Sequence, residues 1–420
     1  MPEATPWVNE TGEDMDCPKL RPVEAIPAEV EGQQVVCLRD PYNFSDRVLL
    51  LPLPLFYIVS LFDGRHSLLD VQAAFVRRYG ELLFRERLDD IVRECDDAHF
   101  LEGEGFETYR AQIEADFARS PIRRAALAGK VYEADPERLR AQIDTFFAPP
   151  EGPGPPQPCN GRPPIKGAVI PHIDFARGGP CYAWAYKALL ESCDADLFIV
   201  LGTSHTGTRG FFAVTRKDYD TPFGVIPTDT SFVDRLIGRC GPTLLQDEQA
   251  HRAEHSIEFQ ATMLQGLLGP KRAIQMVPIL CLSFHELIAG GVSPRSHPAV
   301  ATFLEALQEA IAASGRRCCL IASADLAHVG PRFGDPGPVD NLTLKVVAQK
   351  DLTMLEKVAE RDAEGFFHLV QAEGDRWRIC GLSSIYTLLA ALDAQRGQLL
   401  KYGQWPDPVG TVTFASVIFH

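Results

Sequence analysis

Three short apolar runs, each followed within a few residues by a histidine, constrain this chain more than any other feature. The runs span residues 167–170, 197–201 and 318–322, and the histidines are His172, His205 and His328. Short continuous apolar runs are typical of buried strands in parallel sheets. The carboxyl ends of such strands meet at one edge of the sheet, where α/β folds bind their ligands. The three histidines are therefore candidate site residues.

The other apolar runs in the C-terminal part of the chain alternate between strand-like and helix-like patterns. Strands are expected at residues 211–215, 274–282 and 411–419, and helices at 254–268, 297–314, 340–358 and 382–392. Strands that alternate with helices predict an α/β fold with a mostly parallel sheet, covered by helices on both faces.

The N-terminal part has a different pattern. Residues 1–20 are expected to be disordered. A strand is expected at 33–38 and three small helices at 50–62, 67–79 and 85–99, with residues 100–103 as the start of a short wing. Ser67 is a suitable N-cap for the second helix. Together these elements predict a small winged-helix-like domain ahead of the α/β fold.

Composition and charge exclude several classes of protein. The net charge of −15 argues against a general nucleic-acid binder, because neutralising phosphates requires a surplus of Lys and Arg. No apolar run approaches the roughly 20 residues that span a bilayer, and the acidic N-terminus lacks the features of a signal peptide. We therefore expect a cytoplasmic protein without a membrane segment. The 11 cysteines are scattered and odd in number, which indicates reduced thiols. The sequence carries no feature that specifies an oligomeric state.

The candidate site residues suit a metal ion. Adjacent strands lie about 5 Å apart, so His172 and His205 can reach one ion if their strands are neighbours. Neutral imidazoles are common ligands of iron, zinc and copper. His255 begins a predicted helix, and Glu258 lies one turn further on, where it can hold the second nitrogen of His255 or act as a base. Asp325 is a carboxylate at a strand end and is a candidate ligand or hydrogen-bond acceptor.

Each of these residues also has a structural interpretation. A single histidine at a strand end is more often structural than ligating, so the hypothesis of a site depends on the convergence of His172, His205 and His255. His251 lies four residues before His255, but it is expected to precede the helix. Ser204, in the sequence GTSH, has no base and orienting acid placed beside it as a serine triad requires.

Six short motifs, in order along the chain, resemble one known family. They are AVIPHIDFARGG at 168–179, IVLGTSH at 199–205, TPFG at 221–224, EHSIE at 254–258, SADLAH at 323–328 and CG at 380–381. In this order the motifs resemble the MEMO-like family, whose bacterial members are called AmmeMemoRadiSam system protein B. The resemblance implies the fold of class III extradiol dioxygenases, which are non-haem iron enzymes that open aromatic rings.

The resemblance also implies a metal centre. His172 and His205 match the family's two metal-ligand histidines, and His255 matches a third histidine of its cleft. A divalent transition metal, iron, copper or zinc, is therefore predicted at these three residues.

One position departs from the family's pattern. The position that supplies a cysteine ligand in animal members is Ala327 here, and alanine cannot ligate. Asp325 or the neighbouring His328 would have to substitute. The candidate catalytic residues are His255, Glu258, Asp325 and His328.

The N-terminal part resembles a second family, the PqqD-like winged-helix modules, which hold a precursor peptide for a modifying enzyme. The similar residues are Arg21-Pro22, 35–40, 61–64 with Ser67, and 98–103. Residues 126–147 resemble the opening of the MEMO-like family. We therefore expect a disordered segment at 1–20, a PqqD-like module at 21–118 and a MEMO-like α/β domain at 119–420.

Three functions are consistent with these resemblances. The first is a metal-dependent redox or oxygenase-type enzyme that works with a radical-SAM partner, as the name of the bacterial family implies. The second is a peptide-binding accessory protein, in which the N-terminal module presents a precursor peptide to that partner. The third is a non-catalytic scaffold with a vestigial cleft.

Overall fold

The computed structural model describes residues 16–157, 163–206 and 209–420, which form two compact units. The chain passes from the first unit to the second between Arg119 and Ser120. Each unit has its own hydrophobic core, as expected of separate domains.

The disorder predicted for the first 20 residues concerns mainly residues 1–15, which lie outside the described residues. Residues 16–20 are a correction to that prediction, because their backbone is paired with the rest of the first unit. The Leu20 N–H donates to the Phe62 carbonyl at 2.8 Å, and the Leu68 N–H donates to the Asp16 carbonyl at 2.8 Å.

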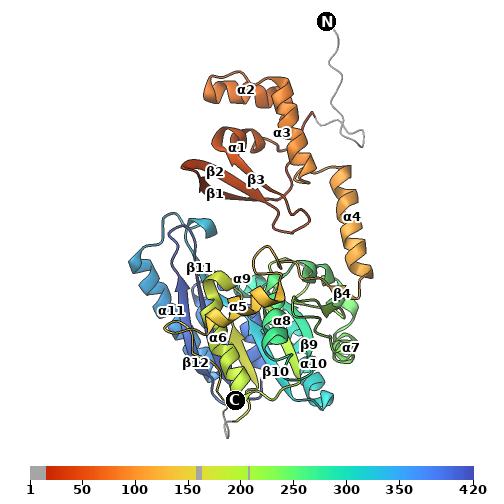
Figure 1. The fold of residues 1–420 in the computed structure, drawn as a ribbon, viewed down its shortest axis with the longest axis vertical. Helices are drawn as coiled ribbons and strands as arrows, with labels where there is room; N and C mark the ends of the chain where they lie inside the picture. The colour runs from red at the N-terminus through yellow and green to blue at the C-terminus, as the bar shows by residue number, and fades with distance from the viewer. Residues whose placement is uncertain (1–15, 158–162, 207–208) are drawn as a thin grey trace. The chain divides into compact units, whose positions relative to one another are not determined.

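The N-terminal unit is a three-stranded antiparallel sheet followed by four helices (Figure 1). In chain order its elements are β1 (Glu24–Val30), β2 (Gln33–Arg39), β3 (Val48–Pro52), α1 (Leu53–Val59), α2 (Leu68–Tyr79), α3 (Arg85–Asp97) and α4 (Glu104–Arg119). Ser67 caps α2, since its hydroxyl accepts from the Asp70 N–H while the Asp70 carboxylate accepts from the Ser67 N–H.

This unit differs from the sequence prediction in three places, the first of which is β1, a strand that was not predicted. The stretch predicted as one helix at 50–62 divides into β3 and α1. Leu49 and Leu51 of β3 are buried and alternate with exposed residues, which is the pattern of a half-buried strand. Where a wing was expected, Leu101 forms an isolated bridge with Leu20 and α4 begins at Glu104.

The C-terminal unit is built on an eight-stranded sheet. Its strands are β5 (Gly167–Ile170), β6 (Leu197–Thr203), β7 (Phe212–Val214), β9 (Gln275–Cys281), β10 (Cys318–Ser323), β11 (Asp325–Val329), β12 (Gln398–Trp405) and β13 (Thr411–Phe419). The order is β11-β13-β5-β10-β6-β9-β7, with β12 paired to β13. The central strands β5, β10, β6 and β9 are parallel, and the flanking strands are antiparallel to their neighbours. The prediction of an α/β fold with a mostly parallel central sheet is confirmed.

Helices and a small second sheet complete this unit. The helices are α5 (Pro136–Phe146), α6 (Phe175–Ser192), α7 (Thr230–Cys240), α8 (His255–Leu267), α9 (His285–Gly290), α10 (Pro298–Ser314), α11 (Asn341–Glu360), α12 (Ala363–Ala372) and α13 (Leu382–Ala391). The short strands β4 (Ile122–Arg123) and β8 (Asp218–Tyr219) pair in parallel. Within the described residues, no helix combines the length and the apolar character needed to cross a membrane.

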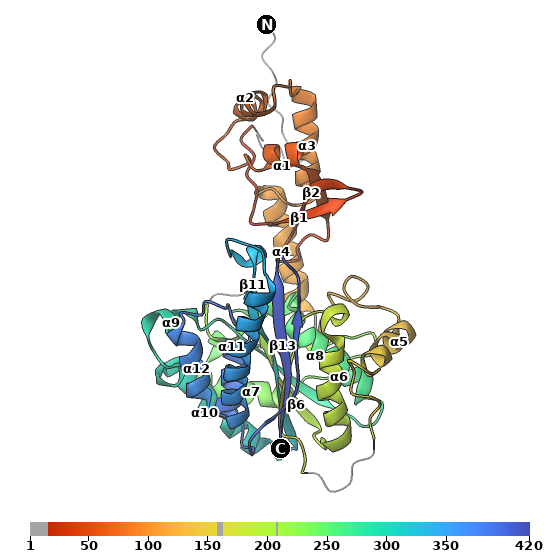
Figure 2. The same ribbon diagram turned by 90° about the vertical axis from the view of Figure 1, so that its left-hand side faces the viewer.

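The central strands are buried on both faces. In β6, Leu197, Ile199 and Leu201 enter one core, while Phe198 and Val200 enter another. This alternation is what the two-residue period of a strand requires when helices cover both faces. Helices α7 and α9 to α13 fill the first core, and α5, α6 and α8 fill the second (Figure 2).

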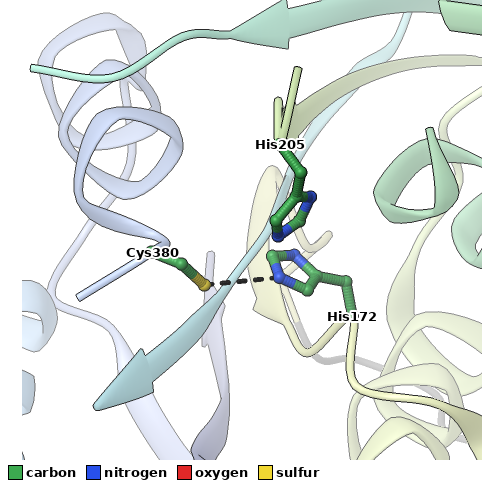
Figure 3. A group of neighbouring side chains, drawn as sticks. All are labelled: His172, His205 and Cys380. Atoms are coloured by element: carbon green, nitrogen blue, oxygen red, sulfur yellow. Dashed lines mark hydrogen bonds between the residues drawn. The ribbon is translucent and has the colours of Figure 1, made fainter. Parts of the chain in front are cut away.

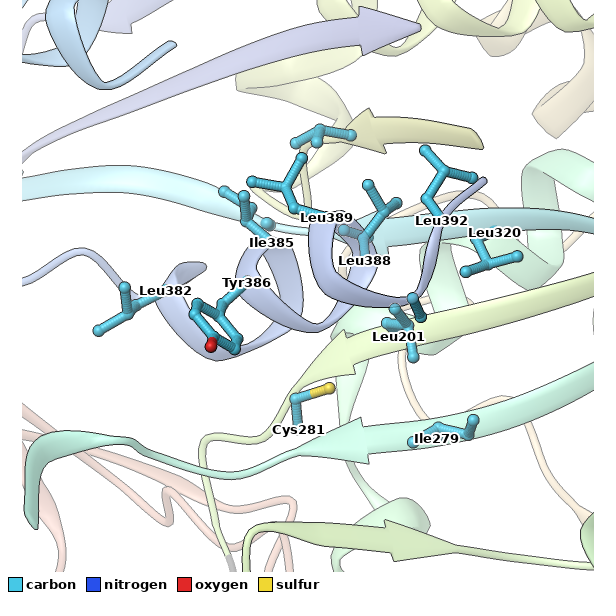
Figure 4. Packing of buried hydrophobic residues seen from close by; sticks show 14 of the residues in the cluster. Leu201, Ile279, Cys281, Leu320, Leu382, Ile385, Tyr386, Leu388, Leu389 and Leu392 are labelled. Carbon is cyan, nitrogen blue, oxygen red and sulfur yellow. The ribbon is translucent and has the colours of Figure 1, made fainter. Parts of the chain in front are cut away.

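Helix α13 lies deep in the first core. Its apolar side chains, among them Ile385 and Leu388, pack with Leu201 of β6 and Ile279 of β9 (Figure 4). The residue before α13 is Gly381, where an added Cβ would lie 2.5 Å from both the Ala324 Cβ and the Asp325 carbonyl oxygen. This close approach requires glycine. It brings the loop ahead of α13 to the carboxyl edge of the parallel strands.

Candidate metal centre

Three histidine rings meet at the carboxyl edge of the sheet. His172 follows β5, His205 follows β6, and His255 is the first residue of α8. The ring centroid of His172 lies 5.2 Å from that of His205 and 5.3 Å from that of His255, and the last two are 4.5 Å apart. β5 and β6 are not neighbours, because β10 lies between them. The rings meet because both strands end at the same edge.

The His172 ring is oriented by the backbone of β10. Its Nδ1 lies 2.9 Å from the Ser323 carbonyl oxygen, so Nδ1 carries the proton and donates it, and the lone pair is on Nε2. The Cys380 Sγ lies 3.3 Å from this Nε2 (Figure 3). The Gln260 amide joins the segments that carry this contact, since it donates to the Pro171 carbonyl at 2.8 Å and to the Ser323 hydroxyl at 2.9 Å.

One buried carboxylate orients the other two rings. Glu254 is the N-cap of α8, and its carboxylate accepts from the backbone N–H of Ser256 at 3.0 Å and of His205 at 2.8 Å. The same carboxylate lies 3.0 Å from His205 Nδ1 and 3.2 Å from His255 Nδ1. The His205 Nδ1 therefore donates to it, which leaves the lone pair of the His205 Nε2 for a metal, whereas the His255 Nδ1 lies only at ion-pair distance. Glu254 thus orients His205, and its carboxylate also forms a second group of possible metal donors with His205 and His255, whose atoms all lie within 4.8 Å of one another.

Burial and charge set the protonation of these groups. Burial, together with the neighbouring His205, lowers the pKa of His172 to about 3, and burial also lowers the pKa of His255. The side chain of His205 is 39% exposed; partial desolvation by its neighbours would lower the pKa of His205, but the Glu254 carboxylate outweighs this effect and raises that pKa. Burial alone would raise the pKa of Glu254, but His205 and His255 hold it well below its ordinary value. At neutral pH, His172 and His255 are therefore neutral imidazoles beside a charged Glu254.

Cys380 is a donor that the sequence analysis did not identify. The Cys380 Sγ and one ring nitrogen each of His172 and His205 all lie within 4.8 Å of one another (Figure 3). Burial raises the pKa of the Cys380 thiol well above its ordinary value, so the thiol keeps its proton until an ion displaces it. Two imidazoles and one sulfur form a donor set that fits a first-row transition ion. The signal was the CG motif at 380–381.

Ala327, the position where the sequence analysis found no ligand, lies within a strand. Ala327 is fully buried in β11, and its N–H donates to the Thr413 hydroxyl at 2.8 Å. The structure brings a cysteine to the histidines from the loop ahead of α13, and that cysteine is Cys380.

Asp325 and His328 lie on β11, beside the histidines. Asp325 accepts from the His172 backbone N–H at 3.0 Å, and its second oxygen lies 3.7 Å from His172 Nε2. Burial raises the pKa of Asp325 to about 6. The His328 Nδ1 donates to the Leu326 carbonyl at 3.1 Å, and burial lowers the pKa of His328 to about 4. His328 is thus a neutral imidazole with its Nε2 lone pair unused by that bond.

Glu258, which the sequence analysis assigned to catalysis, belongs to a different cluster. Its side chain is fully buried and forms an ion pair with Arg123. It also accepts from the Tyr132 hydroxyl at 2.6 Å and from the Leu127 N–H at 2.9 Å. These partners come from the opening segment of the C-terminal unit, so Glu258 anchors that segment to α8 and does not hold the second nitrogen of His255.

His251 is also held by groups outside the candidate metal centre. It lies in a 3₁₀ turn, Glu248–Arg252, ahead of α8. Its Nε2 donates to the Ala213 carbonyl at 3.2 Å, and its Nδ1 accepts from the Tyr219 hydroxyl at 2.8 Å. Both ring nitrogens of His251 are therefore engaged in hydrogen bonds within the fold.

The comparisons with known proteins all point to one family. A family model described as Memo-like protein matches residues 123–416, which include all residues of the candidate centre. A MEMO1 family protein of Aquifex aeolicus is 26% identical over 408 residues, which are 96% of this chain and 100% of the relative. MEMO1 family proteins of Methanopyrus kandleri and Ignicoccus hospitalis are 31% and 30% identical over 72% and 71% of this chain and 98% of each relative. The similarity to the Aquifex protein therefore extends over most of the N-terminal unit.

Proposed function

Because this chain belongs to the family of Memo-like proteins, we propose that it is a metal-dependent redox or oxygenase-type enzyme. Its ion would be held by His172, His205 and Cys380, with His255 as a further nitrogen donor or as a residue that faces the substrate. The observation that carries the proposal is the set of three donor atoms within 4.8 Å of one another. Hydrogen bonds at the Nδ1 atoms of His172 and His205 leave the lone pairs on Nε2, and the Cys380 thiol, itself one of the three donors, lies at hydrogen-bond distance from the His172 Nε2.

The donor set narrows the choice of ion. Imidazole and thiolate together suit copper, zinc and iron, whereas magnesium and calcium prefer oxygen ligands. A bound ion of this kind would supply open positions for substrate or dioxygen and, if it is iron or copper, electron transfer. The resemblance to class III extradiol dioxygenases favours the oxygenase interpretation.

Two residues beside the ligands are suited to moving protons. His328 is neutral at physiological pH and has a free Nε2, so it would accept a proton from a substrate hydroxyl. Asp325 has a pKa raised to about 6 and would exchange a proton close to neutral pH. Asp325 also accepts a hydrogen bond from the His172 backbone N–H, so a change in the protonation of Asp325 would act on the position of His172.

A second candidate function concerns the N-terminal unit. As a PqqD-like module it would bind a precursor peptide and present it to a radical-SAM partner, and the whole protein would be a non-catalytic accessory. The observation in favour is the edge strand β3, where Val48 and Leu50 are 53% and 52% exposed and Leu53 follows at 47%. An exposed apolar edge strand is a template for adding a peptide strand.

Dioxygen uptake tests the enzymatic proposal. Protein loaded with iron, copper or zinc is supplied with a catechol as probe substrate, and dioxygen consumption is compared with that of the free ion. We expect consumption above that background with iron or copper but not with zinc, and its loss in His205→Ala. Bound ion without consumption under any of these conditions contradicts the redox role and favours the accessory function.

Peptide selection tests the accessory function. The full chain is used to select from a displayed library of random peptides. The accessory function predicts enrichment of extended peptides with alternating apolar residues, and loss of their binding in Leu50→Asp while metal binding is unchanged. Failure to enrich any peptide contradicts it.

A further inference from the structure

Arg123 is a fully buried arginine in β4, the first strand of the C-terminal unit. Its guanidinium forms an ion pair with Glu258 and donates to three backbone carbonyls. Those carbonyls are His251 at 2.9 Å, Glu254 at 2.8 Å and Arg124 at 3.0 Å. A charge is stable at such depth only when it is paired and its donors are used, and both conditions hold here.

Two of these bonds reach the segment that orients the metal-binding rings. The Arg123 Nε–H and Nη2–H hold the carbonyls at the two ends of the stretch from His251 to Glu254. The backbone of Glu254 is thereby fixed to Arg123, while its carboxylate holds His205 and His255. A single residue thus separates the buried guanidinium from two rings of the candidate centre.

Balancing the charge of Glu258 would not require this geometry. An ammonium group could pair with Glu258, but it is a point charge on a flexible stem and cannot hold two carbonyls in a planar fork. The face of Tyr219 lies against the guanidinium, with the Arg123 Cζ 5.2 Å from the ring centroid, which further fixes its plane. The arrangement therefore favours a role in positioning over one in charge balance alone.

We propose that Arg123 is a positioning residue for the metal centre: it fixes the peptide of Glu254, and through that carboxylate it sets the orientation of His205 and His255. The inference rests on the proposed function in that the oriented rings serve to bind an ion. The Arg123 side chain holds the backbone carbonyl of Glu254 and is not itself a metal donor. Replacing Arg123 should therefore lower metal affinity without removing any ligand.

The test compares Arg123→Lys with Tyr132→Phe in the full chain. Both variants remove hydrogen bonds to Glu258, but only the first removes the bonds to the carbonyls of His251 and Glu254. The dissociation constant for Zn²⁺ is measured by competition with a chromophoric chelator. We expect roughly 10- to 100-fold weaker binding by Arg123→Lys, as is usual when a group that orients a ligand is lost. Tyr132→Phe should bind as wild type does, although it is less stable to heat.

A measurement on the metal-free protein separates this inference from the proposed function. In wild type and Tyr132→Phe, NMR should show a hydrogen-bonded Nδ1–H proton of His205 that exchanges slowly with solvent, and in Arg123→Lys this proton should exchange faster. If Arg123→Lys does not fold, the double variant Arg123→Met/Glu258→Gln leaves no unpaired buried charge and serves in its place. If wild type binds no ion, the proposed function fails and the exchange rates alone decide the inference. Unchanged exchange with wild-type affinity, or equal loss of affinity in both variants, overturns it.

Discussion

Two buried carboxylates, Glu254 before α8 and Glu258 one turn into it, are the centres of two neighbouring regions with different electrostatics. Glu254 is surrounded by two backbone N–H groups and by the rings of His205 and His255, which can gain or lose a proton or bind an ion. Glu258 is surrounded by Arg123, a permanent cation, and by the Tyr132 hydroxyl.

The difference shows how one helix serves both stability and a site. Burial would raise the pKa of either carboxyl, yet both pKa values lie below the ordinary value because of their partners. The partner of Glu258 keeps its charge at any physiological pH, so that region is suited to holding the fold together. The partners of Glu254 are neutral or weakly basic, so that region can exchange a proton for a metal.

The largest expected effect follows from breaking the permanent ion pair. Glu258→Ala leaves the Arg123 charge buried without a carboxylate, and loss of one partner of a buried pair costs about 3–5 kcal/mol. Denaturant unfolding of the metal-free protein measures the free energy of unfolding. A loss below about 1 kcal/mol, the size typical of an exposed pair, would mean that Glu258 does not anchor the opening segment.

A smaller effect, on metal affinity, is expected from replacing Glu254. Glu254→Gln keeps the size of the side chain but weakens its hydrogen bond to the His205 Nδ1–H and removes the charge beside the His255 ring, so metal affinity should fall roughly 10- to 100-fold. Titration of the apo-protein with Zn²⁺ measures this, and Glu258→Gln in the same assay is the matched control. Equal losses in the two variants would erase the distinction between the two regions.

The third effect is gradual and concerns the dependence of stability on pH. Burial lowers the pKa of His251 to about 3 in the folded chain, whereas an unfolded histidine titrates near 6.5. Below about pH 6.5 the unfolded state therefore binds a proton that the folded state refuses, and the free energy of unfolding falls by about 1.4 kcal/mol per pH unit from this residue. His251→Gln should have a shallower slope between pH 6 and pH 4 than wild type, measured by urea unfolding. Parallel slopes would contradict the assignment of His251 as a buried neutral histidine.

The elements that the sequence predicted well are those whose burial is uniform. β13 was predicted at 411–419, the bounds that the structure gives, because every residue in the run is buried. The half-buried edge strand β12 and the helix α12 were not predicted. In β12 the residues are of intermediate exposure, so neither alternation nor a continuous apolar run marks the strand.

The residues of the candidate metal centre also differ in how well the sequence predicted them. The three histidines were identifiable because each follows a strand or begins a helix, positions at which topology restricts where a side chain can lie. Cys380 lies in a loop. Its proximity to His172 results from the packing of α13 and from the close approach that Gly381 permits because it has no side chain, and both are tertiary effects. Glu258 was misassigned because the spacing from His255 along a helix does not reveal that Arg123 packs against that side.

X-ray absorption at the metal edge of protein purified without chelators tests the central claim, that His172, His205 and Cys380 hold one transition ion. The account predicts about one ion per chain, with one sulfur neighbour at about 2.3 Å and imidazole nitrogens at about 2.0–2.1 Å if the ion is zinc. The sulfur neighbour should be absent in Cys380→Ser, which keeps the shape of the side chain. Protein without iron, copper or zinc, or an ion bound only by nitrogen and oxygen in wild type, would contradict the claim.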